Sequence, residues 1–353
     1  MTISSERLAL THLLRAPATR LERLTAKFRL VDRFPVLSVF LALSLFQTAG
    51  AAHAQDYPVR IIRFIVGFPA GGGTDIVARI TAESLGRVLN QRVIVENKPG
   101  ANTAIAIQSV LKSPADGYTL LFGTTSIASS LYGMKEPGYR LEDFAVIGGV
   151  TSAPLMLIVN TASSKARTLQ EFVAFGKANP DRLTFASDGP TSVNNVMASR
   201  LRETGKFTGR EIPYKGGAQI MPDLMSGIVD AFMGLPSTYM AVMNRPNMTA
   251  LAIANDERME AFPDVPTFAE SGYPTISDIS VTGLWISAAA PKPVIDKLRS
   301  ALAEAMQSPD FKERVEKTKS LVYSQSPAEF EQAIRKTALR FKMDFEHLGI
   351  QPQ

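Results

Sequence analysis

Apolar runs of strand length alternate with amphipathic stretches of helix length from residue 57 onward. Nine of these runs predict β-strands. They cover residues 59–68, 92–96, 118–123, 155–159, 183–186, 211–214, 229–233, 249–254 and 281–287. The regular alternation of strand and helix patterns predicts an α/β fold with largely parallel sheets.

Two of the predicted helices carry clear signals at their N-termini. Thr168 and Glu171 have capping-box spacing just before an apolar stripe with i, i+3, i+4, i+7 spacing. Ser326, Pro327 and Glu329 supply an N-cap, a first-position proline and an N3 carboxylate for a long C-terminal helix. The apolar stripes of the two helices are Leu169, Phe172, Val173 and Gly176, and Phe330, Ile334, Ala338, Phe341 and Phe345.

The N-terminal segment has the three parts of a secretory signal. Residues 1–33 carry seven basic and three acidic residues, the apolar run 34–46 follows, and Ala52-His53-Ala54 forms an A-x-A site. This pattern predicts a signal peptide over residues 1–54, cleavage before Gln55 and a periplasmic mature protein. The alternative is an uncleaved membrane anchor, which needs about 18 or more apolar residues. The apolar run here has 13, which favours cleavage.

The composition excludes several kinds of chemistry. The 353 residues include no cysteine and only three histidines, His12, His53 and His347. A chain without cysteine has no disulfide, no thiolate nucleophile, no Cys-ligated zinc and no cysteine to lipidate. Three scattered histidines assemble no metalloprotease helix. The sequence therefore predicts no catalytic residue, no metal and no cofactor.

The net charge of +5 belongs mainly to the N-terminal segment. Without residues 1–54 the chain has 31 basic and 30 acidic residues, a net charge of +1. A nearly neutral chain without a Lys/Arg tract lacks the electrostatic footprint of a nucleic-acid-binding protein. Nucleic acid is therefore not an expected partner.

A glycine-rich turn at residues 67–74 lies between the first predicted strand and a helix that runs to about Leu89. A strand, a glycine turn and a helix N-terminus make an anion site, because unpaired backbone N–H groups and the helix dipole point the same way. The turn lacks the lysine of a P-loop and the third glycine of the dinucleotide fingerprint. The remaining interpretations are a small anion such as a carboxylate, or a tight turn without a ligand.

Asp75 falls in the first turn of this predicted helix and has two possible roles. A carboxylate there is favoured by the helix dipole and can cap free N–H groups. Alternatively, Asp75 selects a ligand that carries a cationic amine. The sequence favours capping and leaves the second role open.

The loops between the predicted elements are too short to serve as interdomain linkers. A chain with two domains must therefore cross between them on strands. The best candidates for these crossings are residues 146–159 and 280–288, which would return the C-terminal residues to the first domain.

Motifs spread along the chain resemble the Bug, or TctC-like, periplasmic receptors associated with tripartite tricarboxylate transporters. The resemblance rests on several strings in the expected order. They are 68–75 (Phe-Pro-Ala-Gly-Gly-Gly-Thr-Asp), 93–101 (Val-Ile-Val-Glu-Asn-Lys-Pro-Gly-Ala), 116–125, 213–216 (Pro-Tyr-Lys-Gly), 223–227, 263–267 (Pro-Asp-Val-Pro-Thr) and 270–272.

The resemblance implies a type II periplasmic binding protein, an α/β fold of two lobes joined by two crossing strands with a ligand cleft between them. Lobe 1 would contain residues 55–155 and 283–353, and lobe 2 residues 156–282. In the family, loops from both lobes hold the ligand's carboxylate. Carried onto this chain, the expected ligand-binding residues are Phe68, Ala70, Gly71, Gly72, Gly73, Thr74, Asp75, Thr124, Thr125, Ser126, Ser187, Asp188, Gly189, Pro190, Thr191, Ser192, Asn195, Tyr214, Lys215 and Gly216.

The second-lobe loop departs from the family pattern. The family usually has a Ser-Gly-x-Gly-Ser type of loop followed by a histidine. This chain has Asp188, Pro190 and Thr191 in that loop and Asn195 at the histidine position. These departures leave the ligand open among di-, tri- and aromatic carboxylates and amino acids, with a preference for a more apolar or aromatic carboxylate.

The expected function is that of a monomeric receptor that captures a small carboxylate and presents it to membrane permease subunits. Closure of the two lobes follows if the ligand binds the closed state better than the open one. Two other functions remain as alternatives. One is a ligand-sensing subunit for a signalling protein, and the other is an enzyme acting on a carboxylate.

Overall fold

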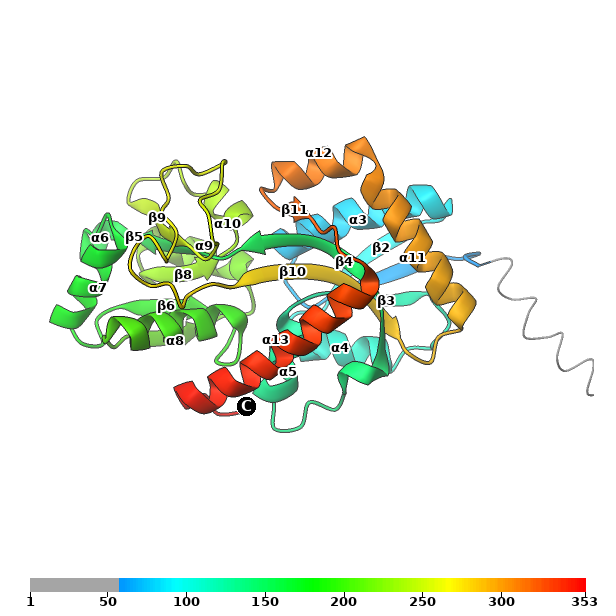
Figure 1. Cartoon of the computed structure of the whole chain (residues 1–353), viewed down its shortest axis with the longest axis horizontal. Coiled ribbons are helices and arrows are strands. Elements are labelled where there is room, and N and C mark those ends of the chain that lie inside the picture. The colour runs from blue at the N-terminus through cyan, green and yellow to red at the C-terminus, as the bar shows by residue number, and fades with distance from the viewer. Residues whose placement is uncertain (1–56) are drawn as a thin grey trace, which may run out of the picture. The chain divides into compact units, whose positions relative to one another are not determined.

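The computed structural model describes residues 57–353, so the predicted signal peptide lies outside the described residues. From Pro58 onward the chain forms two β-sheets flanked by helices (Figure 1). The predicted α/β fold is confirmed, but the prediction of largely parallel sheets is wrong: both sheets are mixed, because β4, β5 and β10 pair antiparallel with their neighbours. Within residues 57–353, no helix combines the length and the apolar character that a membrane span requires.

The first sheet has six strands in the order β11-β4-β10-β3-β1-β2. Strands β1, β2 and β3 are parallel, whereas β10 is antiparallel to both β3 and β4. Strand β11 pairs antiparallel with β4 at the edge. The strands are β1 Ile62–Val66, β2 Val93–Asn97, β3 Thr119–Thr124, β4 Phe144–Pro154, β10 Ile279–Ser287 and β11 Leu321–Val322.

The second sheet has five strands in the order β7-β6-β8-β5-β9. Strand β6 is parallel to β7 and β8, and β5 is antiparallel to β8 and β9. The strands are β5 Met156–Asn160, β6 Thr184–Ser187, β7 Arg210–Pro213, β8 Ala231–Gly234 and β9 Met248–Ile253.

Two neighbouring strands connect the halves of the molecule. Strand β4 ends at Pro154 in the first sheet and β5 begins at Met156 in the second, while the chain returns from β9 to the first sheet through β10. Strands β4 and β10 pair along their length, from Ile279 opposite Pro154 to Ser287 opposite Phe144, and lie side by side in Figure 1. The crossings fall where the sequence predicts them. The residue boundaries assigned to the two lobes stay a prediction.

All nine predicted strands coincide with observed strands, but the sequence pattern did not identify β4 as a strand over its whole length. Strand β4 contains Gly148 and Gly149, which have low strand propensity. A Cβ atom at Gly149 would lie 2.3 Å from the ring of Tyr323, so the glycine permits a close approach of the neighbouring segment. Because this contact is with a residue far along the chain, the sequence around Gly149 does not show the alternating apolar pattern that predicts a strand.

The helices cover both sheets. Around the first sheet they are α3 Gly73–Leu89, α4 Ala104–Leu111, α5 Ser126–Gly133, η2 Leu141–Asp143, α11 Lys292–Gln307, α12 Pro309–Lys317 and α13 Pro327–Leu348. In the second half they are α6 Thr161–Ser164, α7 Leu169–Ala178, α8 Val193–Gly205, α9 Gly217–Ser226 and α10 Pro236–Met240. The predicted capping boxes of α7 and α13 are confirmed.

The predicted apolar stripes of α7 and α13 are buried. Trp285 on β10 packs against Phe330 of α13 with ring centroids 5.3 Å apart and is 2% exposed. Trp285 is therefore a core residue. Burying these large rings at the crossing strands stabilises the junction through the hydrophobic effect.

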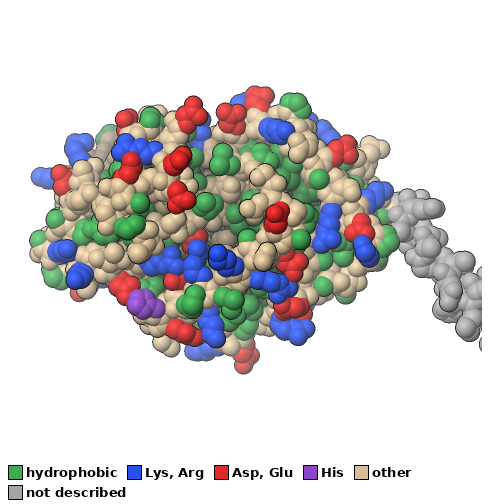
Figure 2. Space-filling view, viewed as in Figure 1, with side chains coloured by type: hydrophobic (Ala, Val, Ile, Leu, Met, Phe, Trp, Pro, Cys, Tyr) green, Lys and Arg blue, Asp and Glu red, His purple; other side chains and the backbone are tan. Residues whose placement is uncertain are grey.

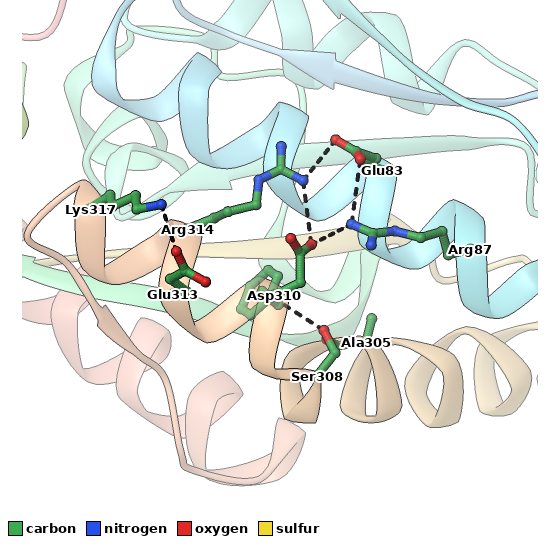
Figure 3. Close-up of polar contacts among 9 residues, drawn as sticks. Glu83, Arg87, Ala305, Ser308, Asp310, Glu313, Arg314 and Lys317 are labelled. Carbon is green, nitrogen blue, oxygen red and sulfur yellow. Dashed lines mark hydrogen bonds and ion pairs between the residues drawn. The ribbon is translucent and has the colours of Figure 1, made fainter.

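Surface charges of both signs are interspersed on the face shown in Figure 2. On the first half, Glu83 and Arg87 of α3 form a network with Asp310 and Arg314 of α12 (Figure 3). Arg314 Nη1 lies 2.7 Å from Glu83 Oε2. Exposed pairs of this kind contribute about 0–1 kcal/mol each, so the network orients α12 on α3 more than it stabilises the fold.

Candidate functional site

A small cavity of about 80 Å³ lies between the two sheets. Seven of the residues expected from the sequence line it: Phe68, Gly72, Gly73, Thr74, Thr124, Ser126 and Asp188. Eleven further residues line it that are outside the expected set: Pro69, Leu155, Val193, Asn194, Gly217, Phe232, Met233, Gly234, Leu235, Thr238 and Ser280. Both halves of the molecule therefore contribute to one site.

The topology of the sheets explains why these residues meet. Strands β1 and β3 of the first sheet and β6 and β8 of the second are followed directly by loops that reach the cavity. Ligands of open α/β sheets bind outside the carboxyl ends of the strands. The site thus occupies the position that this class of fold provides for a ligand.

The first turns of α3, α8 and α9 reach the cavity wall through Gly73, Asn194 and Gly217. The N-cap of α3 is Gly72, which has no side chain and makes no side-chain capping hydrogen bond. The N–H groups of the first helical turn have no partner within a helix. The first turn of α3 therefore presents unpaired N–H groups and the positive end of the helix dipole to the cavity.

In the neighbouring turn after β3, the hydroxyl groups of Thr124 and Ser126 contact one another. Thr124 Oγ1 accepts a hydrogen bond from the Ser126 backbone N–H at 3.1 Å and lies 2.9 Å from Ser126 Oγ. Both hydroxyl groups are buried and face one another. They add polarity to the cavity wall without adding charge.

Both carboxylate oxygens of Asp75 accept hydrogen bonds, from the glycine loop, from α3 and from the end of β2. Its Oδ2 accepts from the Gly71 N–H and from Arg79 Nε, both at 2.9 Å. Its Oδ1 accepts from Asn97 Nδ2 at 2.8 Å and from Arg79 Nη2 at 3.0 Å. Burial acts to raise the pKa of Asp75, but these hydrogen bonds outweigh it and hold the pKa below its ordinary value. Asp75 does not line the cavity, so its geometry supports a structural role.

Asp188 has a different environment at the end of β6. Its Oδ2 accepts from Asn194 Nδ2 at 2.9 Å, and its backbone N–H donates to Asn194 Oδ1 at 3.2 Å. Its Oδ1 is buried and has no hydrogen-bond partner among the described residues. Burial raises the pKa of Asp188 to about 6, an effect that the Asn194 hydrogen bond only partly offsets.

The remaining residues of the second-lobe loop hold its shape. Ser187 Oγ accepts from the Gly189 N–H at 3.0 Å and donates to Glu211. Ser192 Oγ caps α8 by accepting from the Asn195 N–H. Asn195 Nδ2 donates to Pro190 O at 2.7 Å. These contacts fix the backbone that carries Asp188.

Several expected site residues do not line the cavity. Ala70 and Gly71 are exposed at the tip of the glycine loop, and Lys215 is exposed after β7. Tyr214 donates its hydroxyl to Asp223 at 2.6 Å. The others that lie outside the lining are Asp75, Thr125, Ser187, Gly189, Pro190, Thr191, Ser192, Asn195 and Gly216.

Close contacts join the two halves around the cavity. Asn102 Nδ2, on the first half, donates to Thr191 O at 3.0 Å. A Cβ atom at Gly73 would lie 2.6 Å from Ser237 Oγ, and one at Gly216 would lie 2.4 Å from Pro69 Cδ. These contacts describe a closed arrangement that only glycine fits at both positions.

The cavity wall carries little of the chemistry that catalysis uses. Among the residues that line it, Asp188 is the one charged side chain, and the others are apolar, small or hydroxylated apart from the amide of Asn194. Within residues 57–353, no group of three or more His, Cys, Asp or Glu side chains is placed to hold a metal ion. The wall is suited to binding through N–H and hydroxyl groups.

Comparison with known proteins identifies the family. Residues 77–350 match the model of the tripartite tricarboxylate transporter family receptor. The chain is 35% identical to the protein BugT of Bordetella pertussis over 283 residues, which is 77% of this chain and 84% of BugT.

Solved structures agree with this assignment. The periplasmic binding protein BugD has a TM-score of 0.80 and 30% identity, over 84% of this chain and all of BugD. MatC from Rhodopseudomonas palustris with bound malate has a TM-score of 0.77 and 26% identity, over 82% of this chain and 99% of MatC. The type II periplasmic binding protein fold and the resemblance found in the sequence are both confirmed. The chain belongs to the tripartite tricarboxylate transporter receptor family.

Proposed function

We propose that this protein is a periplasmic solute-binding receptor that captures a small carboxylate in the cavity between its two sheets and presents it to a membrane permease. The observation that carries the proposal is the uncapped first turn of α3 at a cavity wall that is otherwise almost uncharged. Membership of a transporter receptor family and the likeness to malate-bound MatC support it.

The carboxylate group would lie at the first turn of α3. The backbone N–H groups of Gly73 and Thr74 are free within the helix, and a glycine N-cap lets an anion approach the main chain closely. Charge-assisted hydrogen bonds from N–H groups to a carboxylate are about twice as strong as neutral ones. Thr124 and Ser126 add hydroxyl groups from the next loop.

The volume of the cavity limits the size of the ligand. Pockets for drug-sized molecules have volumes of about 300–1,000 Å³, whereas this cavity has about 80 Å³. The apolar side chains of Phe68, Phe232 and Leu235 surround the remainder of the space. The ligand is therefore a compact carboxylate whose carbon skeleton contacts these side chains.

Ligand binding would stabilise the closed arrangement of the two halves. The ligand contacts loops from both sheets only when Gly73 approaches Ser237 and Pro69 approaches Gly216. A ligand that binds the closed state better than the open one shifts the population toward it. The closed form is the signal that a permease subunit would recognise.

The proposal also covers the export of the protein and its oligomeric state. The protein would be exported by a signal peptide over residues 1–54, cleaved before Gln55, and would act as a monomer without catalytic turnover. N-terminal sequencing of the protein recovered from a periplasmic fraction tests the export step. A mature N-terminus other than Gln55 would revise the cleavage site, and retention in the cytoplasm would overturn the localisation.

A thermal-shift panel tests the binding function. The full chain, expressed with its own N-terminal segment and purified, is heated with mono-, di- and tricarboxylates, aromatic acids and amino acids. A ligand at 100 times its Kd stabilises the native state by about 2.7 kcal/mol. At least one carboxylate should raise the melting temperature in a saturable manner. The proposal fails if no carboxylate does so, or if a carboxylate that binds is converted to product.

A further inference from the structure

Half-buried Asp188 has one buried carboxylate oxygen that the fold does not use. Asn194 satisfies Oδ2 and the backbone N–H of Asp188, but Oδ1 is buried without a partner among the described residues. A buried polar atom without a partner costs about 1–3 kcal/mol. Such an atom in a native structure calls for an explanation, and an absent ligand is one of the few available.

The loop around Asp188 is built rigidly. Ser192 Oγ lies 2.6 Å from Gly189 O and 2.5 Å from Asn194 Oδ1, so its one proton can be donated to either, and Asn194 Oδ1 also accepts from the Asp188 backbone N–H. Asn194 therefore holds both the carboxylate and the backbone N–H of Asp188. Because the position of the carboxylate does not depend on a flexible side chain alone, a ligand that meets Oδ1 meets a preformed acceptor.

The charge of the cavity indicates what the missing partner is. No lysine, arginine or histidine is among the residues that line the cavity with Asp188. An ionised carboxylate accepts hydrogen bonds and donates none. Its partner must therefore be a donor, and a cationic donor also neutralises the buried charge. A ligand composed only of carboxylate groups would place like charges together.

We propose that Asp188 selects carboxylates that also carry a protonated amine, with Oδ1 accepting a hydrogen bond from the ligand's ammonium group. The ligand's carboxylate lies at the first turn of α3, on the other side of the same cavity. This inference rests on the proposed binding function and specifies its ligand as an amino acid or a related ammonium carboxylate. Asp188 thus takes the role that the sequence left open for Asp75.

Matched sets of ligands that differ at one position test the inference. Each set contains an amine, a hydroxyl and an unsubstituted acid: alanine, lactate and propionate; aspartate, malate and succinate; phenylalanine, phenyllactate and phenylpropionate. Affinities are measured by calorimetry at pH 8 on the full chain. In the set that binds, the amine should bind at least about tenfold more tightly than the unsubstituted acid, because a charged hydrogen bond is gained.

The variant Asp188→Asn tests whether the carboxylate of Asp188 selects the ligand's amine while the fold is retained. It should lower the affinity for the amine at least about tenfold and leave the unsubstituted acid within about threefold. Asp75→Asn is the matched control and should leave the ratio of amine to unsubstituted acid unchanged, because Asp75 does not line the cavity. Circular dichroism of each variant shows that the fold is retained.

The outcomes distinguish the two proposals. If an unsubstituted or hydroxylated acid binds wild type as tightly as its amine, or if Asp188→Asn keeps the preference, the role of Asp188 is wrong while the receptor function stands. If Asp75→Asn abolishes the preference instead, the selecting residue is Asp75. If no member of any set binds while another acid of the thermal-shift panel does, the role of Asp188 is wrong and the receptor function stands. If no carboxylate binds at all, both proposals are overturned.

Discussion

Two loops approach the cavity from opposite halves of the molecule, and each carries an aspartate with a different number of partners. Asp75, after the glycine loop, accepts hydrogen bonds from three residues and uses both oxygens. Asp188, before α8, accepts one hydrogen bond and keeps one oxygen free. The helix caps show the reverse difference, since α3 lacks a capping side chain whereas Ser192 caps α8.

The difference shows how the two halves divide recognition. The first loop uses its carboxylate to hold its own shape and leaves backbone donors free. The second loop satisfies one of its backbone donors and leaves a carboxylate oxygen free. One half thus offers hydrogen-bond donors for an anion, and the other offers an acceptor for a cation. A zwitterionic ligand complements both, which neither loop indicates alone.

The largest expected effect comes from blocking the approach of the two loops. Gly73→Val places a side chain where a Cβ atom would lie 2.6 Å from Ser237 Oγ and 3.1 Å from Leu235 Cδ1. Overpacking of this kind costs about 1–3 kcal/mol, which corresponds to about 5- to 150-fold weaker ligand binding. Calorimetry with the best carboxylate of the panel measures the loss.

Gly72→Ala is the comparison variant and should weaken binding less than Gly73→Val, because its added methyl group meets no atom of the second half. Gly72 has a negative φ, and a Cβ atom there meets only Pro69 O at 3.4 Å, an ordinary contact. Gly73→Val should retain the melting temperature of the ligand-free protein within about 2 °C, because the clash arises only when the halves close. Tight binding by Gly73→Val would show that closure on this contact is not required.

The second-largest effect is expected on the free energy of unfolding, which the unpaired carboxylate oxygen of Asp188 lowers. Burial raises the pKa of Asp188 to about 6 in the folded protein, whereas an unfolded carboxyl group titrates near 3.9. The folded state therefore loses stability as pH rises from about 4 to about 6, by at most about 3 kcal/mol. Asp188→Asn should stabilise the ligand-free protein by about 1–3 kcal/mol at pH 8 and by little at pH 4.5.

Melting temperatures of wild type and Asp188→Asn at both pH values check this expectation. For a domain of this size, 1 kcal/mol corresponds to about 2–4 °C. A variant that melts below wild type at pH 8 would show that the carboxylate is already satisfied, and the contrast between the two aspartates would disappear.

The sequence contained local features of the site but few of its long-range ones. The glycine loop, the crossing strands and the capped helices follow from neighbours in the chain, and so does the Asp75–Arg79 pair, which has i, i+4 spacing. Leu235 and Thr238 reach the cavity only because the second half closes on α3. Whether an oxygen of Asp188 remains free depends on the packing of α8, which no local pattern records.

A smaller effect is expected from Asp75. Asp75→Asn removes the charge that pairs with Arg79 and weakens the acceptor of the Gly71 N–H, at a side chain that is 3% exposed. Hydrogen bonds to charged groups contribute about 1.5–3 kcal/mol, and the amide retains part of them. The variant should lose about 1–2 kcal/mol in urea unfolding at pH 7. If Asp75→Asn instead gained stability, as is expected for Asp188→Asn, the hydrogen bonds to Asp75 would not stabilise the fold. The two aspartates would then not differ as described.

The stability that Asp75 contributes changes with pH in the opposite direction to the stability that depends on Asp188. Hydrogen bonds from Arg79, Gly71 and Asn97 overcome burial and lower the pKa of Asp75 in the folded state. Its stabilising effect is therefore present above the unfolded pKa and is lost as pH falls through the lower folded value. The difference between wild type and Asp75→Asn should shrink in acid, where both carry an uncharged side chain.

The smallest effect is expected at Arg79, the exposed partner of Asp75. Its side chain is 52% exposed, so solvent screens the pair, and exposed i, i+4 pairs contribute about 0.3–0.5 kcal/mol. Arg79→Gln should cost less than about 1 kcal/mol, because Gly71 and Asn97 still donate to the carboxylate. Urea unfolding in low and high salt measures the loss, which should fall at high salt. A loss as large as that of Asp75→Asn would show that the ion pair, rather than the Gly71 and Asn97 hydrogen bonds, holds the glycine loop.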